Sequence, residues 1–302
     1  MQVSLIINCF NGSKFLRKTL DSIVLLNYKN LEIIFYDNCS TDNSISILKS
    51  YKFSNLFVHS PTKNISLGEA RRNAVNLSKG DLICFLDVDD KINNDTLDIY
   101  VKYFKNYNYD VIYGGINYID NNDKFIGKYL PKFNDNVKLK DLLYNFDVNV
   151  PSMCFSRKAF FKINFDSNVK YCEEFGIMVD LASRKSKIIS LDMALSSYRV
   201  HSESLTSLKL DGAAIDRRYI LNKIRDKIIL SEKHAFDFAY YKSYYYEALH
   251  YCKIGKNDIA KSLMYKTIRY SKIYLLIYIV LNLSPKLWLF LHKIKGRKMF
   301  KI

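Results

Sequence analysis

The chain has 302 residues, of which 49% are hydrophobic and 25% charged, a composition typical of a folded protein with a substantial core. Its net charge of +16 is unevenly distributed. Residues 211–302 hold 19 Lys/Arg against 7 Asp/Glu, a net +12, so residues 1–210 hold 27 against 23, a net +4. This distribution excludes a uniformly basic catalytic body and places the basic part in the last third of the chain.

The six cysteines form no Cys-x-x-Cys pair, and Cys84 lies inside an apolar run. We therefore expect buried, reduced thiols in a cytosolic protein rather than a zinc site or a disulfide framework. Residues 1–7 carry no basic segment, and their apolar run is too short for a signal peptide. They are expected to form the first strand.

Strands and helices are predicted to alternate through the first hundred residues. Short apolar runs predict strands at 3–8, 31–36, 56–59 and 82–86, and amphipathic segments predict helices at 13–25, 42–50, 67–77 and 95–104. This alternation indicates a parallel sheet that helices cover on both faces.

The most informative feature is the end of the fourth strand, where Asp87, Asp89 and Asp90 fall within four residues. The carboxyl ends of parallel strands meet at one edge of a sheet, where open α/β folds bind ligands, and Asn11 and Asp37 follow earlier strands at this edge. Carboxylates this close repel one another unless a cation lies between them. The pattern indicates Mg²⁺ or Mn²⁺, which usually also holds substrate phosphates, or else a solvated loop that caps the next helix.

The rest of the chain is less regular up to residue 211. Strands are predicted at 111–113, 125–129, 188–191 and 196–200, with a helix at 173–183. From residue 211 the pattern changes to long helical segments, with a helical hairpin over 233–270, so a domain boundary is expected between 203 and 212.

The usual nucleotide-binding signatures are missing, since the sequence contains no Gly-x-Gly-x-x-Gly and no Gly-x-x-x-x-Gly-Lys. The first strand ends instead in the segment 8–12, Asn-Cys-Phe-Asn-Gly, and a helix is expected to begin there. The backbone amides of such a helix start can bind an anion, although a plain strand-to-helix turn has the same pattern.

Five segments, in order over about 200 residues, resemble the family 2 glycosyltransferases, which are nucleotide-sugar enzymes with the GT-A fold. They are 4–12 (opening strand and donor loop), 32–42 (base-recognition strand and Ser-Thr-Asp turn), 70–73 with 80–90 (Arg-Asn helix and Asp-x-Asp strand), 172–175 (acidic motif) and 198–204 (Tyr-Arg-x-His segment). The resemblance implies an α/β, GT-A-like Rossmann-type fold, with a mostly parallel sheet flanked by helices and a C-terminal α-helical extension. It assigns 1–207 to the catalytic domain (donor half 1–105, acceptor half 106–207) and 208–302 to a basic helical region.

The resemblance also implies roles for single residues. Asp37 would accept a hydrogen bond from the uracil N3–H of a UDP-sugar, with helix capping as the alternative. Asp89 would be the inner-sphere metal ligand, Asp87 would contact the ribose or the metal, and His201 would complete the metal or diphosphate site unless it is structural. The other donor-binding residues would be Cys9, Phe10, Asn11, Asn38, Arg72 and Val88.

Two charged positions, Arg72 and Asp90, keep two interpretations, and Asp42 has one. Arg72 would lie near the nucleotide or form an ion pair with the acidic strand end. Asp90 would ligate the metal or cap a helix, and Asp42 would cap the helix that follows it.

The catalytic base is assigned by the resemblance to Glu174, with Glu173 as the second choice. The family usually has Glu-Asp at this motif, whereas this chain has Glu-Glu; the longer side chain can still accept a proton. A Gly that commonly precedes Phe-Asp upstream of the motif is replaced by Asn164, which affects the local turn rather than the chemistry.

The C-terminal region has its own pattern. The apolar segment 273–283 is too short to span a bilayer, Pro285 interrupts it, and a second apolar segment and the basic segment 293–298 follow. Apolar helices with Trp288 and flanking Lys/Arg are typical of an in-plane anchor on an anionic membrane, and a helical subdomain with a solvated basic end is the alternative. Nucleic-acid binding is not expected, because no motif for it is present.

The sequence therefore predicts an inverting glycosyltransferase that uses Mn²⁺ or Mg²⁺ and a nucleotide-sugar, with UDP as the expected nucleotide. The acceptor would be a saccharide or a lipid-linked saccharide in bacterial surface polysaccharide, capsule or lipooligosaccharide synthesis. The enzyme would be cytoplasmic and peripheral at the inner membrane. Two alternatives are a non-catalytic nucleotide-sugar-binding subunit of a membrane assembly and a sugar-phosphate or polyol-phosphate transferase.

Overall fold

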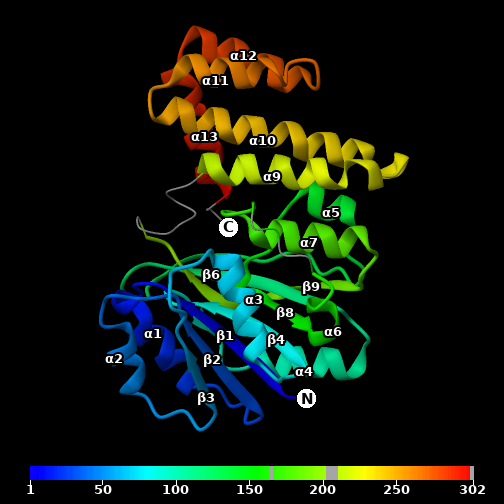
Figure 1. Ribbon diagram of the computed structural model, residues 1–302. Helices are drawn as coiled ribbons and strands as arrows, with labels where there is room; N and C mark the ends of the chain where they lie inside the picture. The colour runs from blue at the N-terminus through cyan, green and yellow to red at the C-terminus, as the bar shows by residue number, and fades with distance from the viewer. Residues whose placement is uncertain (164–165, 167, 202–209, 300–302) are drawn as a thin grey trace. The chain divides into compact units, whose positions relative to one another are not determined.

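The computed structural model describes residues 1–163, 166, 168–201 and 210–299, and the chain divides into two compact units (Figure 1). The first unit contains Met1–Lys138, Asp147–Ser167 and Asp180–Val200, and the second contains Leu139–Phe146, Asn168–Val179 and His201–Ile302. The boundary predicted between 207 and 208 and the Asn164 position both lie outside the described residues.

Over the described residues, the first unit is built on a nine-stranded sheet in the order β3-β2-β1-β4-β8-β6-β9-β5, with β7 paired to β6. Its first four strands, all parallel, are β1 (Val3–Cys9), β2 (Leu31–Asp37), β3 (Leu56–His59) and β4 (Leu82–Asp87). The connecting helices are α1 (Ser13–Val24), α2 (Ser44–Lys49) and α3 (Leu67–Leu77), and α4 (Thr96–Asn106) follows the short strand β5 (Lys91–Ile92). The predicted α/β alternation is confirmed.

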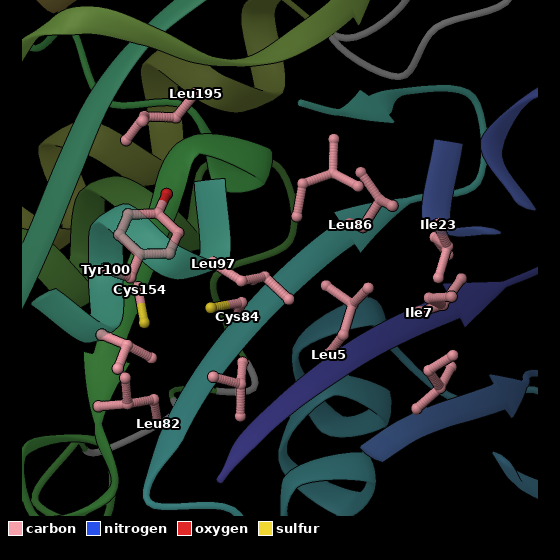
Figure 2. Packing of buried hydrophobic residues seen from close by; sticks show 14 of the residues in the cluster. Leu5, Ile7, Ile23, Leu82, Cys84, Leu86, Leu97, Tyr100, Cys154 and Leu195 are labelled. Carbon is pink, nitrogen blue, oxygen red and sulfur yellow. The ribbon is translucent and has the colours of Figure 1, made fainter. Parts of the chain in front are cut away.

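The central strands form the core because their side chains are apolar on both faces. Leu5, Ile7, Cys84 and Leu86 are all at most 2% exposed, and Figure 2 shows them packed with Leu97 and Tyr100 of α4 and with Leu195 of β9. β1 pairs with β2 and with β4 in parallel register, so that Cys9 is opposite Asp37 and Asn8 is opposite Asp87. The strand ends that carry the predicted site are therefore adjacent.

The second half of the sheet is mixed, and its strands are longer than the sequence predicts. The strand predicted at 111–113 extends through Gly114 and Gly115 as β6 (Val111–Ile119). A Cβ atom on Gly115 would lie 2.2 Å from the backbone oxygen of Tyr129, so these glycines mark a close backbone approach rather than a turn.

The two strands predicted at 188–191 and 196–200 are one strand, β9 (Ile188–Arg199), which pairs with β6 through two register shifts. The short strand β8 (Met153–Ser156) pairs antiparallel with both β4 and β6. β7 (Phe125–Tyr129) was predicted at its observed position. The smaller elements of this half are the 3₁₀ helix η1 (Val150–Ser152) and α6 (Arg157–Phe160).

The second unit is helical. Its helices are α5 (Leu139–Tyr144), the first turns of α7 (Glu173–Ser183), α9 (Leu210–Ile224), α10 (Lys233–Lys253), α11 (Asn257–Tyr265), α12 (Lys272–Leu283) and α13 (Pro285–Met299), with the 3₁₀ turns η2 (Arg225–Lys227) and η3 (Leu230–Glu232). α10 and α11 form the predicted hairpin, and Gly255 turns the chain between them with φ +80. The apolar segment is interrupted at Pro285, as predicted. No helix in the described part of the chain is long and apolar enough to cross a membrane.

Candidate active site at the strand ends

The loop after β1 is locked to the loop after β2. The backbone N–H of Asn11 donates to Ser40 Oγ (2.9 Å), and its side-chain Oδ1 accepts from the N–H of Thr41 (2.8 Å). Asn11 has φ 51 and Cys39 has φ 64, a conformation that is uncommon outside Gly but best tolerated by Asn. The donor loop predicted from the sequence is thus held by specific bonds to the Ser-Thr-Asp turn.

Asp42 holds the starts of two helices, although the N-cap of α2 is Asn43 and not Asp42 as predicted. Its Oδ2 accepts from the N–H of Ser13 in α1 (2.8 Å), and its Oδ1 accepts from the N–H of Ser44 in α2 (3.0 Å). Burial alone would raise the pKa of this carboxyl, but the hydrogen bonds from Ser44 and Ser13 outweigh it and lower the pKa to about 2.

The predicted donor residues after β1 and β4 differ in exposure. Cys9 is buried, and burial raises the pKa of its thiol, whereas the Phe10 side chain is 55% exposed. Val88 packs on Gly12 so closely that a Cβ atom on Gly12 would lie 2.8 Å from Val88 Cγ2. The donor loop and the Asp-Val-Asp turn therefore form one packed surface.

Asp37 and Asn38 at the end of β2 are both buried, but their side chains are used differently. The Asn38 amide bonds the backbone of Ile65 on both sides, donating to its oxygen (2.8 Å) and accepting from its N–H (3.1 Å). Asp37 accepts through Oδ2 from the N–H of Ser40 (3.3 Å) and from Ser60 Oγ (3.4 Å). Among the described residues its buried Oδ1 has no hydrogen-bond partner, so one oxygen of Asp37 can still accept from a ligand.

Arg71, and not Arg72, forms the ion pair with the acidic end of β4 in the described part of the chain. The interpretation of Arg72 as the partner of this strand end was therefore wrong. Arg71 is 5% exposed, and its Nη2 lies 3.0 Å from Asp87 Oδ1. Arg72 lies on the exposed side of α3. Arg71 shares the buried helix face with Ala70, Ala74 and Val75, so helical periodicity was the signal that distinguishes the two arginines.

Asp89 and Asp90 point to different surroundings. Asp89 is half-buried, whereas Asp90 is 1% exposed and accepts through Oδ1 from the N–H of Arg199 (2.8 Å). The helix that follows begins after Asp95, so Asp90 does not cap it. Asp90 instead connects the segment 87–90, here called the acidic turn, to the end of β9. Among the described residues its buried Oδ2 has no hydrogen-bond partner.

The Arg199 side chain holds the backbone of the acidic turn by a hydrogen bond, a role that was not predicted from the sequence. Its side chain is fully buried, its Nε donates to the backbone oxygen of Asp89 (2.8 Å), and its Nη1 donates to the backbone oxygen of Asp120 (2.7 Å). Nη1 also lies 2.6 Å from Asp123 Oδ1, and the guanidinium stacks on the Phe15 ring at 4.8 Å. The only signal was its position in the Tyr-Arg-x-His segment.

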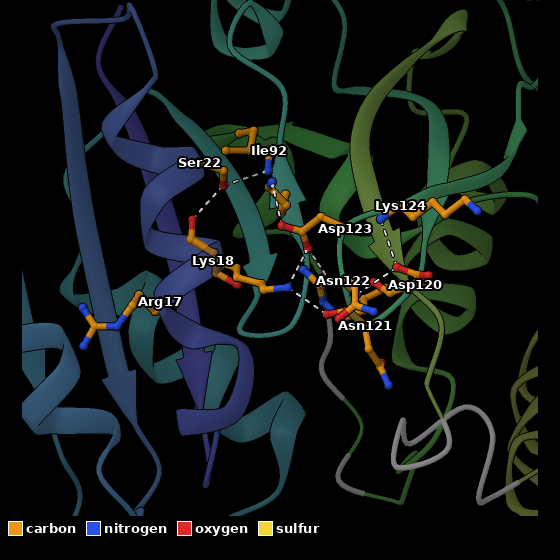
Figure 3. Close-up of polar contacts among 12 residues, drawn as sticks. Arg17, Lys18, Ser22, Ile92, Asp120, Asn121, Asn122, Asp123 and Lys124 are labelled. Carbon is orange, nitrogen blue, oxygen red and sulfur yellow. Dashed lines mark hydrogen bonds and ion pairs between the residues drawn. The ribbon is translucent and has the colours of Figure 1, made fainter.

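The turn between β6 and β7 adds to these contacts (Figure 3). Lys18 of α1 donates to the backbone oxygen of Asn121 (2.7 Å) and forms an ion pair with Asp123 (3.5 Å). Lys91 forms a second ion pair with Asp123 (3.3 Å). Burial would raise the pKa of Asp123, but Arg199 and Lys91 lower it. Three cations therefore converge on one carboxylate next to the acidic turn.

The predicted base and the predicted third metal ligand belong to the second unit. Glu173 is buried and Glu174 is half-buried, and both lie in the first turn of α7. His201, two residues after the end of β9, is half-buried. Their roles in catalysis and in metal binding stay predictions.

The acidic turn has part of the chemistry of a divalent cation site. In the described residues no group of three or more His, Cys, Asp or Glu side chains is arranged to hold a metal. Burial raises the pKa of Asp87, Arg71 opposes this effect and the neighbouring Asp89 carboxylate adds to it. Because a cation would relieve the repulsion between Asp87 and Asp89, these two carboxylates fit Mg²⁺ or Mn²⁺.

Comparison with known proteins gives relatives of one kind. Glycosyltransferase GlyA of Streptococcus pneumoniae is 27% identical over 221 residues, which are 68% of this chain and 31% of that protein, so the chain spans about a third of GlyA. The enzyme UDP-Glc:alpha-D-GlcNAc-diphosphoundecaprenol beta-1,3-glucosyltransferase WfaP of Escherichia coli is 26% identical over 216 residues, covering 68% of this chain and 80% of WfaP.

A solved structure shows the same fold. The mannosyltransferase PcManGT from Pyrobaculum calidifontis, in complex with GDP-Man and Mn²⁺, superposes with a TM-score of 0.63 at 15% identity over 95% of this chain and 83% of that one. The family described as Glycosyl transferase family 2 matches residues 4–165, which is more than half of the chain and contains the donor loop and the acidic turn. The chain belongs to glycosyl transferase family 2.

Proposed function

We propose that this protein is an inverting, metal-dependent glycosyltransferase that transfers a sugar from a UDP-sugar to a saccharide or lipid-linked saccharide acceptor. The observation that carries the proposal is the gathering of Asp37, Asp87 and Asp89 at adjacent strand ends of a family 2 chain. The names of two relatives support the donor and the acceptor class: WfaP uses UDP-Glc and a diphosphoundecaprenol-linked sugar, and another is a poly(ribitol-phosphate) beta-glucosyltransferase. We place the reaction in bacterial surface polysaccharide, capsule or lipooligosaccharide synthesis.

The chain's own groups supply recognition and proton removal. The unsatisfied Oδ1 of Asp37 accepts from uracil N3–H, and the loop at Cys9, Phe10 and Asn11 contacts the nucleotide. Asp89 and Asp87 hold the cation, with His201 as the third protein ligand; when bound, Mg²⁺ or Mn²⁺ offsets the negative charge that develops on the leaving diphosphate.

Proton removal from the acceptor is assigned to a carboxylate at the start of α7. Glu174 is the more exposed of the two glutamates, so it accepts the proton of the acceptor hydroxyl as this oxygen attacks the anomeric carbon. A single displacement of this kind inverts the anomeric centre. Glu173 is the second candidate.

The test is UDP release from UDP-glucose, UDP-galactose and UDP-N-acetylglucosamine with Mn²⁺, after a thermal-shift screen of these donors. Asp89→Ala is expected to remove the Mn²⁺-dependent turnover, and Glu174→Gln to lower kcat by roughly 10²–10⁴-fold. Glu69→Gln, an exposed carboxylate in the first turn of α3, is the matched control and is expected to keep wild-type turnover. Undiminished turnover of Asp89→Ala would remove the metal assignment, and near-normal turnover of Glu174→Gln would move the base to Glu173.

We further propose that the enzyme acts at the cytoplasmic face of the inner membrane and contacts it through α12. Ile273, Leu276 and Leu283 of this helix are 68%, 60% and 79% exposed, which is unusual for three large apolar side chains on one short helix. Lys272 and Lys286 flank them, and after Asp258 the chain holds ten Lys/Arg and no acid. An apolar helix face with basic flanks matches an anionic lipid surface.

Vesicle flotation tests the membrane contact. The wild-type chain is expected to float with phosphatidylglycerol vesicles and less with phosphatidylcholine vesicles. Replacing Ile273, Leu276 and Leu283 by Ser should abolish flotation. The control Leu230→Ser, at a position 88% exposed outside α12, should float as the wild type does. Equal flotation of the triple variant and the wild type would contradict the proposal.

A further inference from the structure

The segment before the predicted base is held by one buried carboxylate of α9. Asp216 is 6% exposed, and its Oδ2 accepts from two consecutive backbone N–H groups, those of Lys170 (2.7 Å) and Tyr171 (2.6 Å). Hydrogen bonds from backbone amides to an ionised carboxylate are among the strong ones in proteins. Two of them on adjacent residues fix both the position and the direction of the backbone that enters α7.

Two further contacts of α9 also hold the segment that leads into α7. The Cys172 thiol donates to the backbone oxygen of Ala213 (3.6 Å). A Cβ atom on Gly212 would lie 2.3 Å from the ring of Tyr171, so the helix backbone and the ring are in close contact. The α9 helix therefore contacts three consecutive residues that lead into the acidic motif.

The first turns of α7 are packed on α9 as well. The Arg217 guanidinium stacks on the Phe175 ring at 5.0 Å, and a Cβ atom on Gly176 would lie 3.3 Å from Ile220 Cδ1. Burial raises the pKa of the Cys172 thiol, Glu174 adds to this effect and Arg217 opposes it.

We propose that Asp216 is a positioning residue for catalysis: by holding the backbone of Lys170 and Tyr171 it sets where the glutamates of α7 stand. The inference rests on the proposed function, because it takes Glu174 as the base. It gives Asp216 a positioning role in catalysis, although the sequence places its helix in the C-terminal extension. A general base acts only within hydrogen-bond reach of the proton that it removes, so a small shift of α7 costs rate.

The variants Asp216→Ala and Asp216→Asn separate the hydrogen bonds from the charge. Alanine removes the acceptor of both N–H groups, whereas asparagine keeps an oxygen that accepts them. With the UDP-sugar of the panel that the wild type turns over fastest, Asp216→Ala is expected to lower kcat by about 10- to 10²-fold with little change in the KM of the donor. Asp216→Asn should recover most of the rate. Asp211→Asn, on the same helix but 3.7 Å from His250, is the control with wild-type rate.

A double-mutant cycle with the base distinguishes positioning from a general loss of structure. In the Glu174→Gln background the base is already removed, so adding Asp216→Ala should lower kcat by less than about twofold. An equal loss in both backgrounds, or wild-type kcat of Asp216→Ala alone, would overturn the inference. If Glu173→Gln proves to be the variant that lowers kcat, the cycle is run with that residue.

Hydrogen exchange gives a readout that needs no turnover. In the full chain the amides of residues 168–176 should exchange faster in Asp216→Ala than in the wild type, and at the wild-type rate in Asp216→Asn. Unchanged exchange in Asp216→Ala would overturn the inference even for an active enzyme. If the wild type released no UDP from any donor while this exchange result held, the proposed function would be at fault and the anchoring by Asp216 would stand.

Discussion

The Nε of Arg199 donates a hydrogen bond to the backbone oxygen of Asp89 over 2.8 Å. The two residues are 110 positions apart in the sequence, and the bond joins the last residue of β9 to the turn that carries the proposed metal ligands. It acts on the backbone of Asp89 rather than on its carboxylate. Arg199 also binds Asp90 in this turn, because its backbone N–H donates to Asp90 Oδ1.

Replacing Arg199 by Ala is expected to lower the free energy of unfolding by about 3 kcal/mol, because it removes a fully buried cation and leaves Asp123 and two backbone oxygens without it. Urea unfolding measures the loss. Lys91→Ala is the matched control, since Lys91 pairs with the same carboxylate but is partly exposed, and it should cost less than about 1 kcal/mol. Equal losses for the two variants would show that burial of Arg199 is not what matters.

Arg71 and Arg72 form a second matched pair. Arg71→Met should weaken the binding of UDP with Mn²⁺ and lower the unfolding free energy, because it leaves the Asp87 carboxylate without its ion pair. Arg72→Met, on the exposed side of the same helix, should change the unfolding free energy by less than about 0.5 kcal/mol. Calorimetric titration of UDP with Mn²⁺ then also tests whether Arg72 contacts the nucleotide, as the sequence predicts.

These two arginines show what the sequence could and could not predict. The alternation of apolar runs gave the parallel strands, because strand burial on both faces is a local property of the sequence. The carboxyl-end position of Asp37 and Asp87 followed from that alone. The role of Arg199 could not be predicted, because it depends on how β9 pairs with β6 across two register shifts. The ion pair of Arg71 with Asp87 was not predicted, because the motif rather than the helix face was followed. The contact of Arg72 with the nucleotide stays a prediction.

The pattern of apolar residues also could not predict strands that contain glycines or are very short. Gly114 and Gly115 are typical of a turn in sequence, yet they lie within β6 where neighbouring backbone and side chains leave no room for a Cβ atom. β8 has four residues and β5 has two, which is too short for a periodicity to be recognised. Their positions are determined by pairing with distant strands.

The contact between Gly12 and Val88 predicts that a second substitution, at Val88, restores part of the UDP binding lost by a substitution at Gly12. Gly12→Ala would place a Cβ atom 2.8 Å from Val88 Cγ2, so the donor loop and the Asp-Val-Asp turn must move apart, and we expect weaker binding of UDP with Mn²⁺. Val88→Ala removes the Cγ2 methyl group and leaves Val88 Cβ at 3.0 Å, so the double variant should recover part of the affinity. Titration of the four proteins gives the coupling. Additive losses in the double variant would mean that this contact does not position the loop.

Asp42 predicts how stability depends on pH. Its pKa in the folded chain is about 2 against a usual value of 3.8, so the folded state favours the ionised form. The stabilisation is fully present above about pH 4 and is lost as the pH falls through 2. With allowance for its partial exposure, it amounts to about 1–2 kcal/mol.

Urea unfolding between pH 2 and 7 measures this effect. Asp42→Ala should lower the unfolding free energy at pH 7 by about 1–2 kcal/mol and flatten its decrease at low pH, since the N–H groups of Ser13 and Ser44 lose their acceptor. Asp21→Ala is the control: Asp21 accepts only from Tyr51 Oη among the described residues, at an exposed position, and its variant should change the unfolding free energy at pH 7 by less than about 0.5 kcal/mol. A wild-type slope in Asp42→Ala would assign the acid sensitivity to other carboxylates.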